Sequence, residues 1–317
     1  MDVLLVGAGP MAQDYARVLE AQKRDFKVVG RGIENITKFQ KHFPSIECFH
    51  GGLEKYLASH SAASQAIAAV PVSKLYDIAV QLLDAGVSNI LLEKPGALFK
   101  ENVDNLIALK KGALIDIAYN RRFYQAVRHA KEIIQEDGGV LSCTFEFTEW
   151  VHVIGSGRHS DAILRKWVLA NSSHVIDLVF HLCGIPRILH PYISGDDIKW
   201  HPSGSIFVGS GVTVRGIPFS YHSNWNSPGR WGVEILTAQH RLYLKPMEKL
   251  HVQEKGSVAV EEHVGDYSID DKFKPGLFNE VTAFFEQHTN VLCSIEEHRR
   301  HFEFFETIAG YEAVRNQ

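Results

Sequence analysis

A lysine that follows an apolar run is the first residue in this sequence with a plausible chemical role. The run Ile90–Leu92 is followed by Glu93, Lys94 and Pro95. Pro95 has no backbone N–H and disfavours helix at the residue before it, so the run predicts a strand that ends in a sharp turn at Lys94. Ligands of open α/β sheets bind at the carboxyl ends of strands, where a lysine can exchange a proton with a hydroxyl or carbonyl group. A surface turn with ordinary charges is the alternative.

A glycine-rich turn follows the first apolar run of the chain, Val3–Val6. It consists of Gly7, Ala8, Gly9, Pro10, Met11 and Ala12. This is the G-x-G-x-x-A form of the dinucleotide fingerprint: Gly7 makes the tight turn, Gly9 lets the backbone approach a pyrophosphate, and the small Ala12 lets a helix pack on the strand. The helix that follows presents backbone N–H groups and the positive end of its dipole to the phosphates. The pattern therefore predicts a dinucleotide site.

Taken together, the glycine turn and Glu93-Lys94-Pro95 resemble the Gfo/Idh/MocA family, named for glucose–fructose oxidoreductase and inositol dehydrogenase. The resemblance covers nearly the whole chain. It implies that Lys94 lies beside the nicotinamide and the substrate hydroxyl, with Glu93 near the cofactor and a bond before Pro95 that is commonly cis. Val70 and Pro71 match the family's proline-containing turn, which lies near the cofactor.

Composition limits the class of protein. A chain of 317 residues with 45% hydrophobic content can bury a large core, and suggests one large or two medium domains. The formal net charge of −4 gives no reason to expect nucleic acid or an anionic membrane as a partner. The four cysteines lack C-x-x-C spacing and are interpreted as reduced thiols, so no metal is expected. The chain begins with a strand and no run approaches about 18 apolar residues, so we expect a cytoplasmic protein without a signal peptide.

Residues 1–118 alternate short apolar runs with helical patterns, which is typical of βαβ units and a parallel sheet. The fold class expected is α/β, with an N-terminal Rossmann domain over residues 1–118. The predicted strands are Val3–Val6, Phe26–Val29, Ala66–Ala69, Ile90–Leu92 and Leu114–Ala118. The predicted helices are Met11–Gln22, Ile36–His42, Leu53–Ser59, Lys74–Ala85 and Glu101–Lys111.

The end of the second predicted strand bears on the choice of cofactor. NAD-specific Rossmann domains usually place an acid there for the ribose 2′-OH. This chain has Arg31 at that point, and its first carboxylate is Glu34. An arginine can pair with a 2′-phosphate, so the sequence favours NADP over NAD. The alternative is an exposed Arg31, with Glu34 or a backbone group binding NAD.

Residues 119–317 predict a second, α+β domain with a large, mostly antiparallel open sheet, for substrate binding and oligomerisation. Its predicted strands are Leu141–Trp150, Pro186–Ser194, Ser205–Phe207, Val212–Ile217, Phe219–Asn224, Gly232–Leu236, Arg241–Lys245 and Leu250–Val252. Its predicted helices are Tyr124–Gln135, Asp161–Leu169, His174–Cys183, Pro275–His288 and Ile295–Arg315. The family usually covers the outer face of this sheet by dimerisation, which implies a homodimer or homotetramer. In members with this Asn-Arg-Arg pattern, residues at the crossover approach the active site, so Asn120 and Arg121 are candidate ligand contacts; solvated arginines are the alternative.

A helical segment supplies the second set of chemical groups. His174, Asp177 and His181 have the i, i+3, i+7 spacing of one helical face. Metal binding, a structural His174–Asp177 pair and catalysis are the three interpretations. The resemblance favours catalysis, because a His-x-x-Asp on this helix matches the family's active-site helix; His174 would then exchange the proton of the reacting hydroxyl, and Asp177 would orient the helix or the ring. Family dehydrogenases often carry an aspartate four residues before the histidine, where this chain has Ala170.

Residues 224–232 are rich in groups that recognise sugars. Tryptophan faces stack on pyranose rings and arginine supplies directional polar contacts, which makes Trp225 and Arg230 candidate substrate residues. The segment resembles sequences of family members in amino-sugar or surface-polysaccharide synthesis; a rigid hairpin with buried rings is the alternative. Residues 155–160 are expected to form a lid or a surface loop, with Trp167 as a further candidate contact.

The combined interpretation is an NAD(P)-dependent oxidoreductase. It would transfer a hydride between nicotinamide and a secondary hydroxyl or carbonyl of a monosaccharide, inositol or nucleotide sugar, with Lys94 and His174 handling the proton. Two alternatives stay open. One is an NAD-dependent glycosidase, as some relatives are. The other is a non-catalytic dinucleotide sensor, which the missing acid at Ala170 favours.

Overall fold

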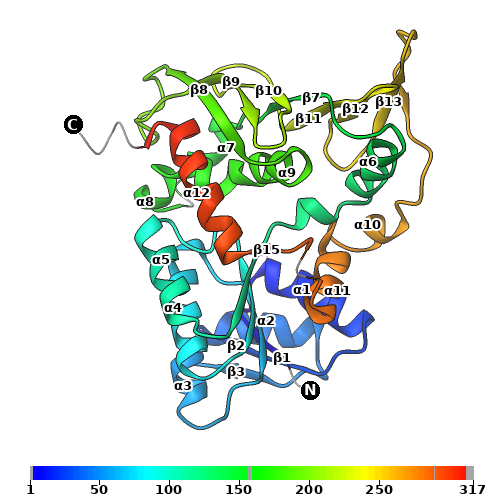
Figure 1. Ribbon diagram of the computed structural model, residues 1–317. Coiled ribbons are helices and arrows are strands. Elements are labelled where there is room, and N and C mark those ends of the chain that lie inside the picture. Colours follow the sequence, from blue (N-terminus) through cyan, green and yellow to red (C-terminus); the bar gives the residue numbers. More distant parts are fainter. Residues whose placement is uncertain (1–2, 156, 158, 289, 312–317) are drawn as a thin grey trace. The chain divides into compact units, whose positions relative to one another are not determined.

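The computed structural model describes residues 3–155, 157, 159–288 and 290–311 (Figure 1). The chain forms two compact units. The first comprises Met1–Asn120 and Lys272–Arg299, and the second comprises Arg121–Asp271 and Arg300–Gln317. The segment Lys272–Arg299 thus returns to the first unit, whereas the sequence suggested two consecutive domains. The assignment of cofactor binding to one unit and substrate binding to the other stays a prediction.

The first unit is built on a seven-stranded sheet with the order β15-β6-β5-β4-β1-β2-β3. All its strand pairs are parallel except β15 with β6. The strands are β1 Val3–Val6, β2 Phe26–Gly30, β3 Cys48–His50, β4 Gln65–Ala68, β5 Asn89–Glu93, β6 Leu114–Ala118 and β15 Cys293–Ser294. The central strands β1, β4 and β5 are almost wholly buried, as expected for parallel strands covered on both faces.

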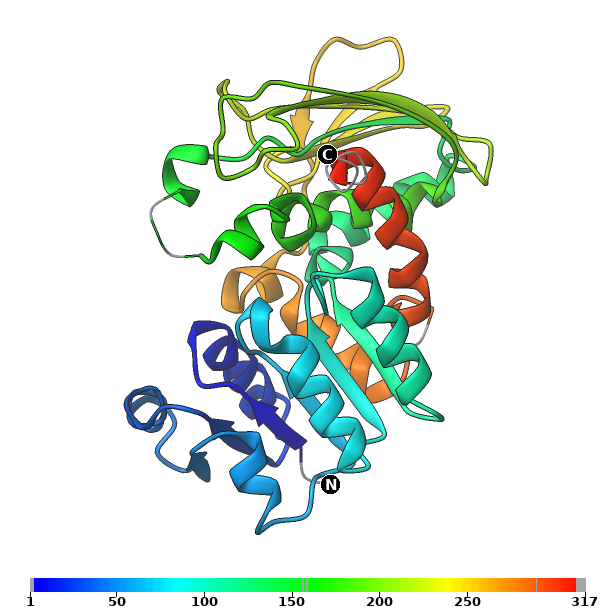
Figure 2. The same cartoon turned by 90° about the vertical axis from the view of Figure 1, so that its left-hand side faces the viewer.

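Helices cover both faces of this sheet (Figures 1 and 2). They are α1 Pro10–Ala21, α2 Ile33–His42, α3 Leu53–Leu57, α4 Val72–Asp84, α5 Lys100–Leu109 and α11 Leu277–Glu286. The strands β1, β2, β4 and β5 are parallel, so their carboxyl ends lie at one edge of the sheet. The strand order runs outward from β1 and β4 in two directions. This edge carries the glycine turn and Lys94.

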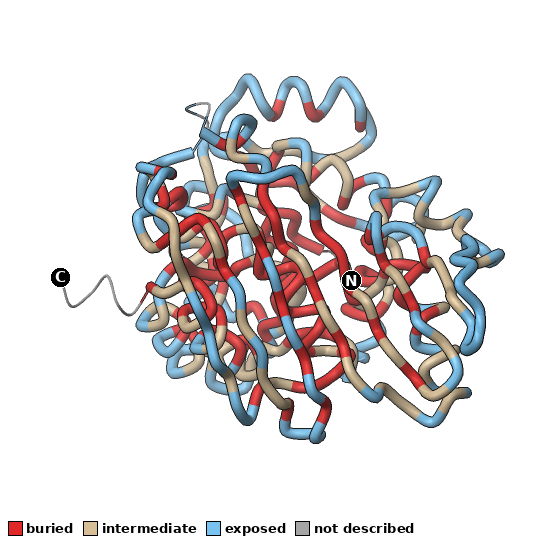
Figure 3. The backbone as a smooth tube through the Cα atoms, turned by 90° about the horizontal axis from the view of Figure 1, so that it is seen from above, coloured by how far each residue is buried: buried red, intermediate tan, exposed pale blue. Residues whose placement is uncertain are grey.

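The second unit is built on an eight-stranded sheet with the order β14-β13-β12-β11-β7-β10-β9-β8. Only β10 with β7 is parallel. The strands are β7 Ser142–Glu146, β8 Pro186–Ser194, β9 Ile206–Thr213, β10 Pro218–Asn224, β11 Gly232–Leu236, β12 His240–Leu244, β13 His251–Glu254 and β14 Glu261–Glu262. Residues along β10 alternate between exposed and buried, which gives the sheet one covered and one open face (Figure 3).

Helices pack against the covered face of the second sheet; α9 contacts β7 and β11, and α6 contacts β12. The helices are α6 Gln125–Glu136, α7 Val151–Ile154, α8 Asp161–Leu164, α9 Ser173–Cys183 and α10 Ser268–Lys272. A 3₁₀ turn spans Asn120–Phe123, a π-helical segment spans Val168–Ser172, and α12 spans Ile295–Ala309. Within the described residues, no helix has the length and apolar character needed to cross a membrane.

The expected fold class is confirmed, and so is nearly every predicted element in the first 118 residues. Two details differ. The short strand β3 was missed, and the predicted strands Ser205–Phe207 and Val212–Ile217 are parts of the single strand β9 and the turn after it. The last predicted helix ends at Ala309, and the part of it predicted beyond residue 311 lies outside the described residues.

The glycines of β9 explain why it was predicted as two strands. Gly209 and Gly211 lie in the gap between the two predicted strands. In the structure they lie under aromatic rings of β10: a Cβ on Gly209 would stand 2.4 Å from the Tyr221 ring, and one on Gly211 would stand 2.6 Å from the Phe219 ring and 2.1 Å from the carbonyl oxygen of Ile188 on β8. The glycines therefore mark close ring packing on a continuous strand.

Candidate active site

The glycine turn after β1 has the shape that the sequence predicted. Gly7 has φ of +129°, which L side chains rarely adopt. Its N–H donates to the carbonyl of Val29 at 2.8 Å, and a Cβ at this position would stand 2.2 Å from the carbonyl oxygen of Ala69. A glycine is therefore required at position 7, because its backbone bonds to β2 and leaves no room for a side chain beside Ala69, the residue after β4.

Gly9 is different, because the protein's own backbone does not require a glycine there. Its φ is −83°, and a Cβ would have no neighbouring atom within 4 Å. It precedes α1, which begins with Pro10, has no acidic residue in its first turn and no side-chain cap. An open space beside an uncapped helix N-terminus fits the pyrophosphate of a dinucleotide. Ala12 is fully buried, as the fingerprint requires, and Met11 accepts a contact from Lys274 Nζ at 3.1 Å.

Two further predicted cofactor residues lie at the same edge of the sheet. Arg31 is exposed directly after β2, and the first turn of α2 carries Glu34. Pro71 is the exposed residue before α4, after the end of β4. Both follow parallel strands at their carboxyl ends.

Lys94 follows the last residue of β5 and is partly exposed, and the Lys94–Pro95 peptide bond is cis, as the resemblance implied. The preceding Glu93 accepts a hydrogen bond from the hydroxyl of Tyr15 at 2.9 Å. Burial raises the pKa of Glu93, while the charges of Lys94 and Lys274 act in the opposite direction. The turn that carries Lys94 is thus tied to helix α1.

Tyr15 also links Glu93 to the C-terminal segment of this unit. Its hydroxyl lies 3.5 Å from Oε2 of Glu280 on α11, and both Tyr15 and Glu280 are fully buried. Burial, followed by the two carboxyl groups, raises the pKa of Tyr15 well above its usual value. Asn120 is anchored in the same unit, because its Nδ2 donates to the carbonyl of Pro275 at 2.9 Å.

In the second unit, His174 lies in the first turn of α9, directly after the π-helical segment Val168–Ser172. It is 6% exposed, and its ring centroid is 6.1 Å from that of Trp231. The π-helical segment turns Asn171 and Ser172 toward Glu149, to whose Oε1 they donate at 3.0 and 2.7 Å. Ala170 is buried in this segment. Single π-helical turns are frequent at functional sites.

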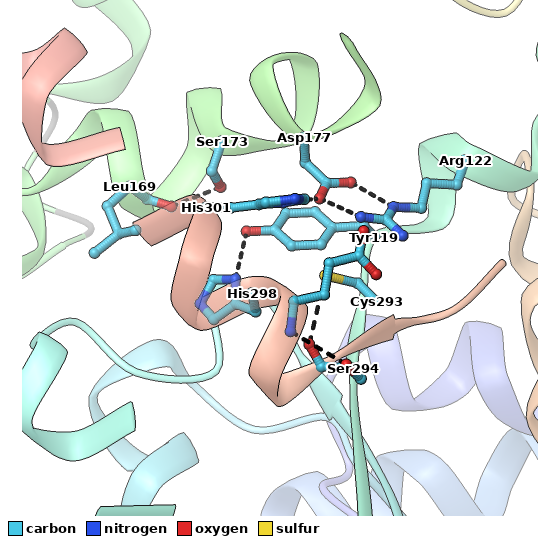
Figure 4. Close-up of polar contacts among 10 residues, drawn as sticks. Tyr119, Arg122, Leu169, Ser173, Asp177, Cys293, Ser294, His298 and His301 are labelled. Carbon is cyan, nitrogen blue, oxygen red and sulfur yellow. Dashed lines mark hydrogen bonds and ion pairs between the residues drawn. The ribbon is translucent and has the colours of Figure 1, made fainter. Parts of the chain in front are cut away.

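Asp177 lies one turn further along α9 and is fully buried. Arg122 binds both of its oxygens at 2.7 Å, and Nδ1 of His301 lies 3.1 Å from Oδ1 (Figure 4). The Arg122 guanidinium and His301 hold the pKa of Asp177 well below its usual range, against the effect of burial. Its two oxygens thus contact Arg122 and His301. Nearby, burial and the charges of Arg122 and Lys131 lower the pKa of His181 to about 3.

Two arginines flank Trp231. The guanidinium carbons of Arg121 and Arg230 each lie 4.7 Å from the centre of the Trp231 ring. Arg230 also lies 4.7 Å over Trp150 and 3.6 Å from Oε2 of Glu149. Burial lowers the pKa of Arg121 and the charge of Arg230 acts in the same direction, while Tyr124, Glu248 and Glu149 act against them.

Two other candidate tryptophans lie within an aromatic cluster of the second unit. Trp225 packs against His201 at 4.6 Å, Phe207 at 5.2 Å and Trp200 at 6.0 Å. Trp167 packs edge-on against Trp200 at 6.2 Å. Both are buried, and their roles as substrate contacts stay predictions. Positions 156 and 158 of the predicted lid lie outside the described residues.

The structure thus groups the candidates by unit. In the first unit the glycine turn, Arg31, Pro71 and Lys94 lie at one sheet edge, and in the second His174 lies with the arginines around Trp231. Sequence reasoning missed Tyr15 and Glu280 as partners of Glu93, and Glu149 as the acceptor that organises the start of α9. The only available signal was Glu149 as a charge next to Trp150 in a predicted strand. Contacts across long sequence separations leave no local pattern.

Three comparisons place the chain among known proteins. Residues 1–114 match the model of an oxidoreductase family with an NAD-binding Rossmann fold, GFO_IDH_MocA. No curated protein matches the sequence. An oxidoreductase from Agrobacterium radiobacter, solved with NAD+, L-tartaric acid and magnesium, is 13% identical, with a TM-score of 0.78 over 100% of this chain and 96% of that one.

Two sugar dehydrogenases also share the fold. Levoglucosan dehydrogenase, solved with NADH and levoglucosan, is 17% identical, with a TM-score of 0.77 over 99% of this chain and 97% of that one. UDP-N-acetylglucosamine 3-dehydrogenase from Acidithiobacillus ferrooxidans is 17% identical, with a TM-score of 0.73 over 97% of this chain and 96% of that one.

Proposed function

We propose, from the match of residues 1–114 to the model of the Gfo/Idh/MocA oxidoreductases, that the protein is an NAD(P)-dependent dehydrogenase of a sugar-like substrate. It would transfer a hydride between the nicotinamide and a secondary hydroxyl or carbonyl carbon. The observation that carries the proposal is the glycine turn: Gly7 is required by its own backbone, whereas Gly9 leaves an open space at the start of α1.

The dinucleotide would be held by the edge of the first sheet. Gly9, Pro10 and Met11 would face the pyrophosphate, Arg31 would face the adenosine ribose, and Pro71 would line the path between them. When bound, the nicotinamide supplies the hydride chemistry. Glu93, fixed by Tyr15, would hold the turn that presents Lys94.

Lys94 and His174 would handle the proton of the reacting hydroxyl. The ammonium group of Lys94 would hydrogen-bond the substrate oxygen at its Nζ and stabilise the charge that develops there. A ring nitrogen of His174 would accept or return the proton. Since Ala170 replaces the aspartate that often accompanies this histidine, the two residues would share the task.

A carbohydrate-like substrate is supported by the groups in the second unit. Exposed Trp150 and the guanidinium of Arg230 offer a ring face and directional donors, which are the groups that recognise sugars. The two sugar dehydrogenases that share the fold point to the same class of substrate.

The test of the proposal is a calorimetric titration of nucleotide-free protein with NADH and NADPH. We expect tight binding of at least one, with NADPH preferred. Arg31→Ala should reduce the NADPH preference by about tenfold or more, since a 2′-phosphate loses a charged partner. Arg17→Ala, which removes an equally charged exposed residue of α1, should leave it unchanged. If neither dinucleotide binds, the proposed function is wrong.

Turnover assays then separate the alternatives. A dehydrogenase accumulates reduced cofactor with at least one polyol or sugar. A glycosidase of this type would hydrolyse its substrate with a retained cofactor and no net reduction. A sensor would bind the dinucleotide and turn over nothing, and the alanine at position 170 is the feature that favours it.

We also propose that the protein forms a homodimer or homotetramer through the open face of the second sheet. This face includes the exposed side chains of Val208, Ser220 and Tyr192. Light scattering should give a mass of two or four chains, and Tyr192→Glu should shift it toward the monomer. A monomer at micromolar concentration would contradict the proposal.

A further inference from the structure

Lys274 places a positive charge beside the glycine turn, although it is 263 positions from Met11 in the sequence. Its Nζ lies 3.1 Å from Sδ of Met11, the second residue of α1, and 3.8 Å from Oδ2 of Asp14 one turn further along. The side chain of Lys274 is 43% exposed. The lysine belongs to the segment Lys272–Arg299, which is part of the same unit as the glycine turn. The C-terminal part of the chain thus brings a cation to the start of α1.

Both contacts of the Lys274 ammonium are weak. A thioether sulfur such as that of Met11 is a weak hydrogen-bond acceptor. The 3.8 Å to Asp14 Oδ2 is longer than a charge-assisted hydrogen bond, and Oδ1 of the same carboxylate accepts from Arg17 at 2.6 Å. A lysine ammonium has three donors. A stronger acceptor can therefore bind Nζ without breaking a strong bond within the protein.

The backbone around Lys274 is held in place. The carbonyl of Pro275 accepts from Nδ2 of Asn120 at 2.9 Å, and the carbonyl of Lys274 accepts from the N–H of Leu277 at 3.0 Å. Leu277 begins α11, is fully buried, and α11 packs against α1. The root of the lysine is therefore fixed relative to α1 while its end is exposed, which lowers the entropy lost when a ligand binds there.

The glycine turn itself supplies no side-chain cation for a dinucleotide. Residues 7–13 include no lysine, arginine or histidine, so the turn offers only backbone N–H groups and the positive end of the α1 dipole. Each phosphate of a dinucleotide carries a negative charge. Burial raises the pKa of Glu93, and Lys274 is one of the charges that act against it, after Lys94. The charge of Lys274 thus acts on the end of β5 as well as on the start of α1.

We propose that Lys274 binds the pyrophosphate of the dinucleotide, so that the C-terminal segment completes the cofactor site that the glycine turn begins. This inference rests on the proposed function and adds a residue to its cofactor site. The Lys274 ammonium donates to a phosphate oxygen, which is a much stronger acceptor than the sulfur of Met11. The open space at Gly9 and the N–H groups of α1 bind the same group.

The experiment is a calorimetric titration of nucleotide-free protein at constant ionic strength. One probe is whichever of NADH and NADPH binds more tightly, and the other is the same molecule without its nicotinamide, ADP-ribose or its 2′-phosphate. Lys274→Met removes the charge and keeps a side chain of similar shape. It should weaken both probes by about tenfold or more, because a charge-assisted hydrogen bond to the pyrophosphate is lost. Lys274→Arg keeps the charge and should stay within about threefold of the wild type.

Two further variants separate this role from a structural one. Asp14→Asn removes the carboxylate next to Nζ, and it should leave the affinity unchanged or raise it, because a negative charge near the phosphates is lost. Lys272→Met is the matched control. Lys272 is an exposed lysine of the same segment whose ammonium lies 5.4 Å over the ring of Phe273, and its loss should not change the affinity. Thermal unfolding of each variant checks that it is folded.

The proposal is overturned if folded Lys274→Met binds both probes as tightly as the wild type. It is also overturned if only the complete dinucleotide is weakened, because Lys274 would then act on the nicotinamide. An equal loss in Asp14→Asn would mean that the pair of Lys274 and Asp14 supports the shape of the site, and would overturn it too. The proposed function fails separately, when the wild-type protein binds neither dinucleotide.

Discussion

Lys94 and His174 are the two residues on which the proposed proton transfer depends. Lys94→Ala should lower kcat by about 10²- to 10⁴-fold, the usual contribution of a positioned acid or base, while dinucleotide affinity changes little. His174→Ala should have a loss of similar size. Steady-state kinetics and dinucleotide titration of the same preparations measure both effects.

The double variant distinguishes shared from separate roles. If both residues act on the same proton, the loss in Lys94→Ala/His174→Ala is smaller than the product of the two single losses, because residues that act as a unit are not additive. Retained turnover in Lys94→Ala together with lost dinucleotide binding would refute its catalytic role.

We expect His181 to make the stability of the protein fall in acid. Its folded-state pKa of about 3 lies below the ordinary value near 6.5, so between these values the unfolded chain binds the proton and the folded chain does not. The free energy of unfolding should therefore fall as pH drops below about 6.5. By pH 4.5 the loss due to His181 should be about 2.5 kcal/mol.

Urea denaturation at pH 7 and pH 4.5 measures this loss. His181→Gln should show a smaller drop in unfolding free energy between the two pH values than the wild type. The exposed His190→Gln is the control and should follow the wild type. An equal drop in His181→Gln and wild type would mean that His181 is charged in the folded protein.

At the scale of elements, the turn between β1 and α1 contains two glycines with different roles: Gly7 is needed for the fold, and Gly9 is expected to face the ligand. Gly7→Ala places a Cβ 2.2 Å from a backbone oxygen at a positive φ, so it should destabilise the protein by about 2 kcal/mol or more. Gly9→Ala fills open space, so it should change the unfolding free energy by less than about 0.5 kcal/mol. It should nevertheless weaken dinucleotide binding by about tenfold, because the Cβ occupies the space of the pyrophosphate.

Thermal unfolding and dinucleotide titration of the two variants test this contrast. Unchanged dinucleotide affinity in a well-folded Gly9→Ala would show that the open space at the start of α1 does not hold the pyrophosphate.

At the scale of the whole molecule, the first unit is discontinuous in sequence. Helix α11 buries Leu277, Val281 and Phe284 in it, and Nε2 of Gln22, the residue after α1, donates to the carbonyl of Phe278 at 3.1 Å. Without the segment 272–299, fragment 1–120 should lose on the order of 5 kcal/mol, comparable to the stability of a domain.

Circular dichroism of fragment 1–120 should therefore show a loosely folded protein, and adding the peptide 272–299 should restore cooperative thermal unfolding. A fragment that unfolds cooperatively at the temperature of the full chain would show that α11 is dispensable for this unit.

The sequence by itself determined most elements of the first unit and the types of residue at their ends. The glycine turn, the strand ending at Lys94 and the α/β alternation depend on residues a few positions apart, so their patterns are local and readable. The family resemblance rests on those local motifs, and residues 1–114, which carry them, match the family model. The same holds for Gly232–Leu236 and Pro186–Ser194, whose bounds agree with the structure.

The tertiary structure decided which of these residues meet. Tyr15 contacts Glu93 and Glu280, which is 265 positions from it. Arg122 and His301 bind Asp177, and Trp231, rather than Trp225, contacts two arginines. Such contacts depend on packing and burial across the chain. For the same reason β9 looked like two strands: the need for glycine under Tyr221 and Phe219 exists only once β10 lies beside it.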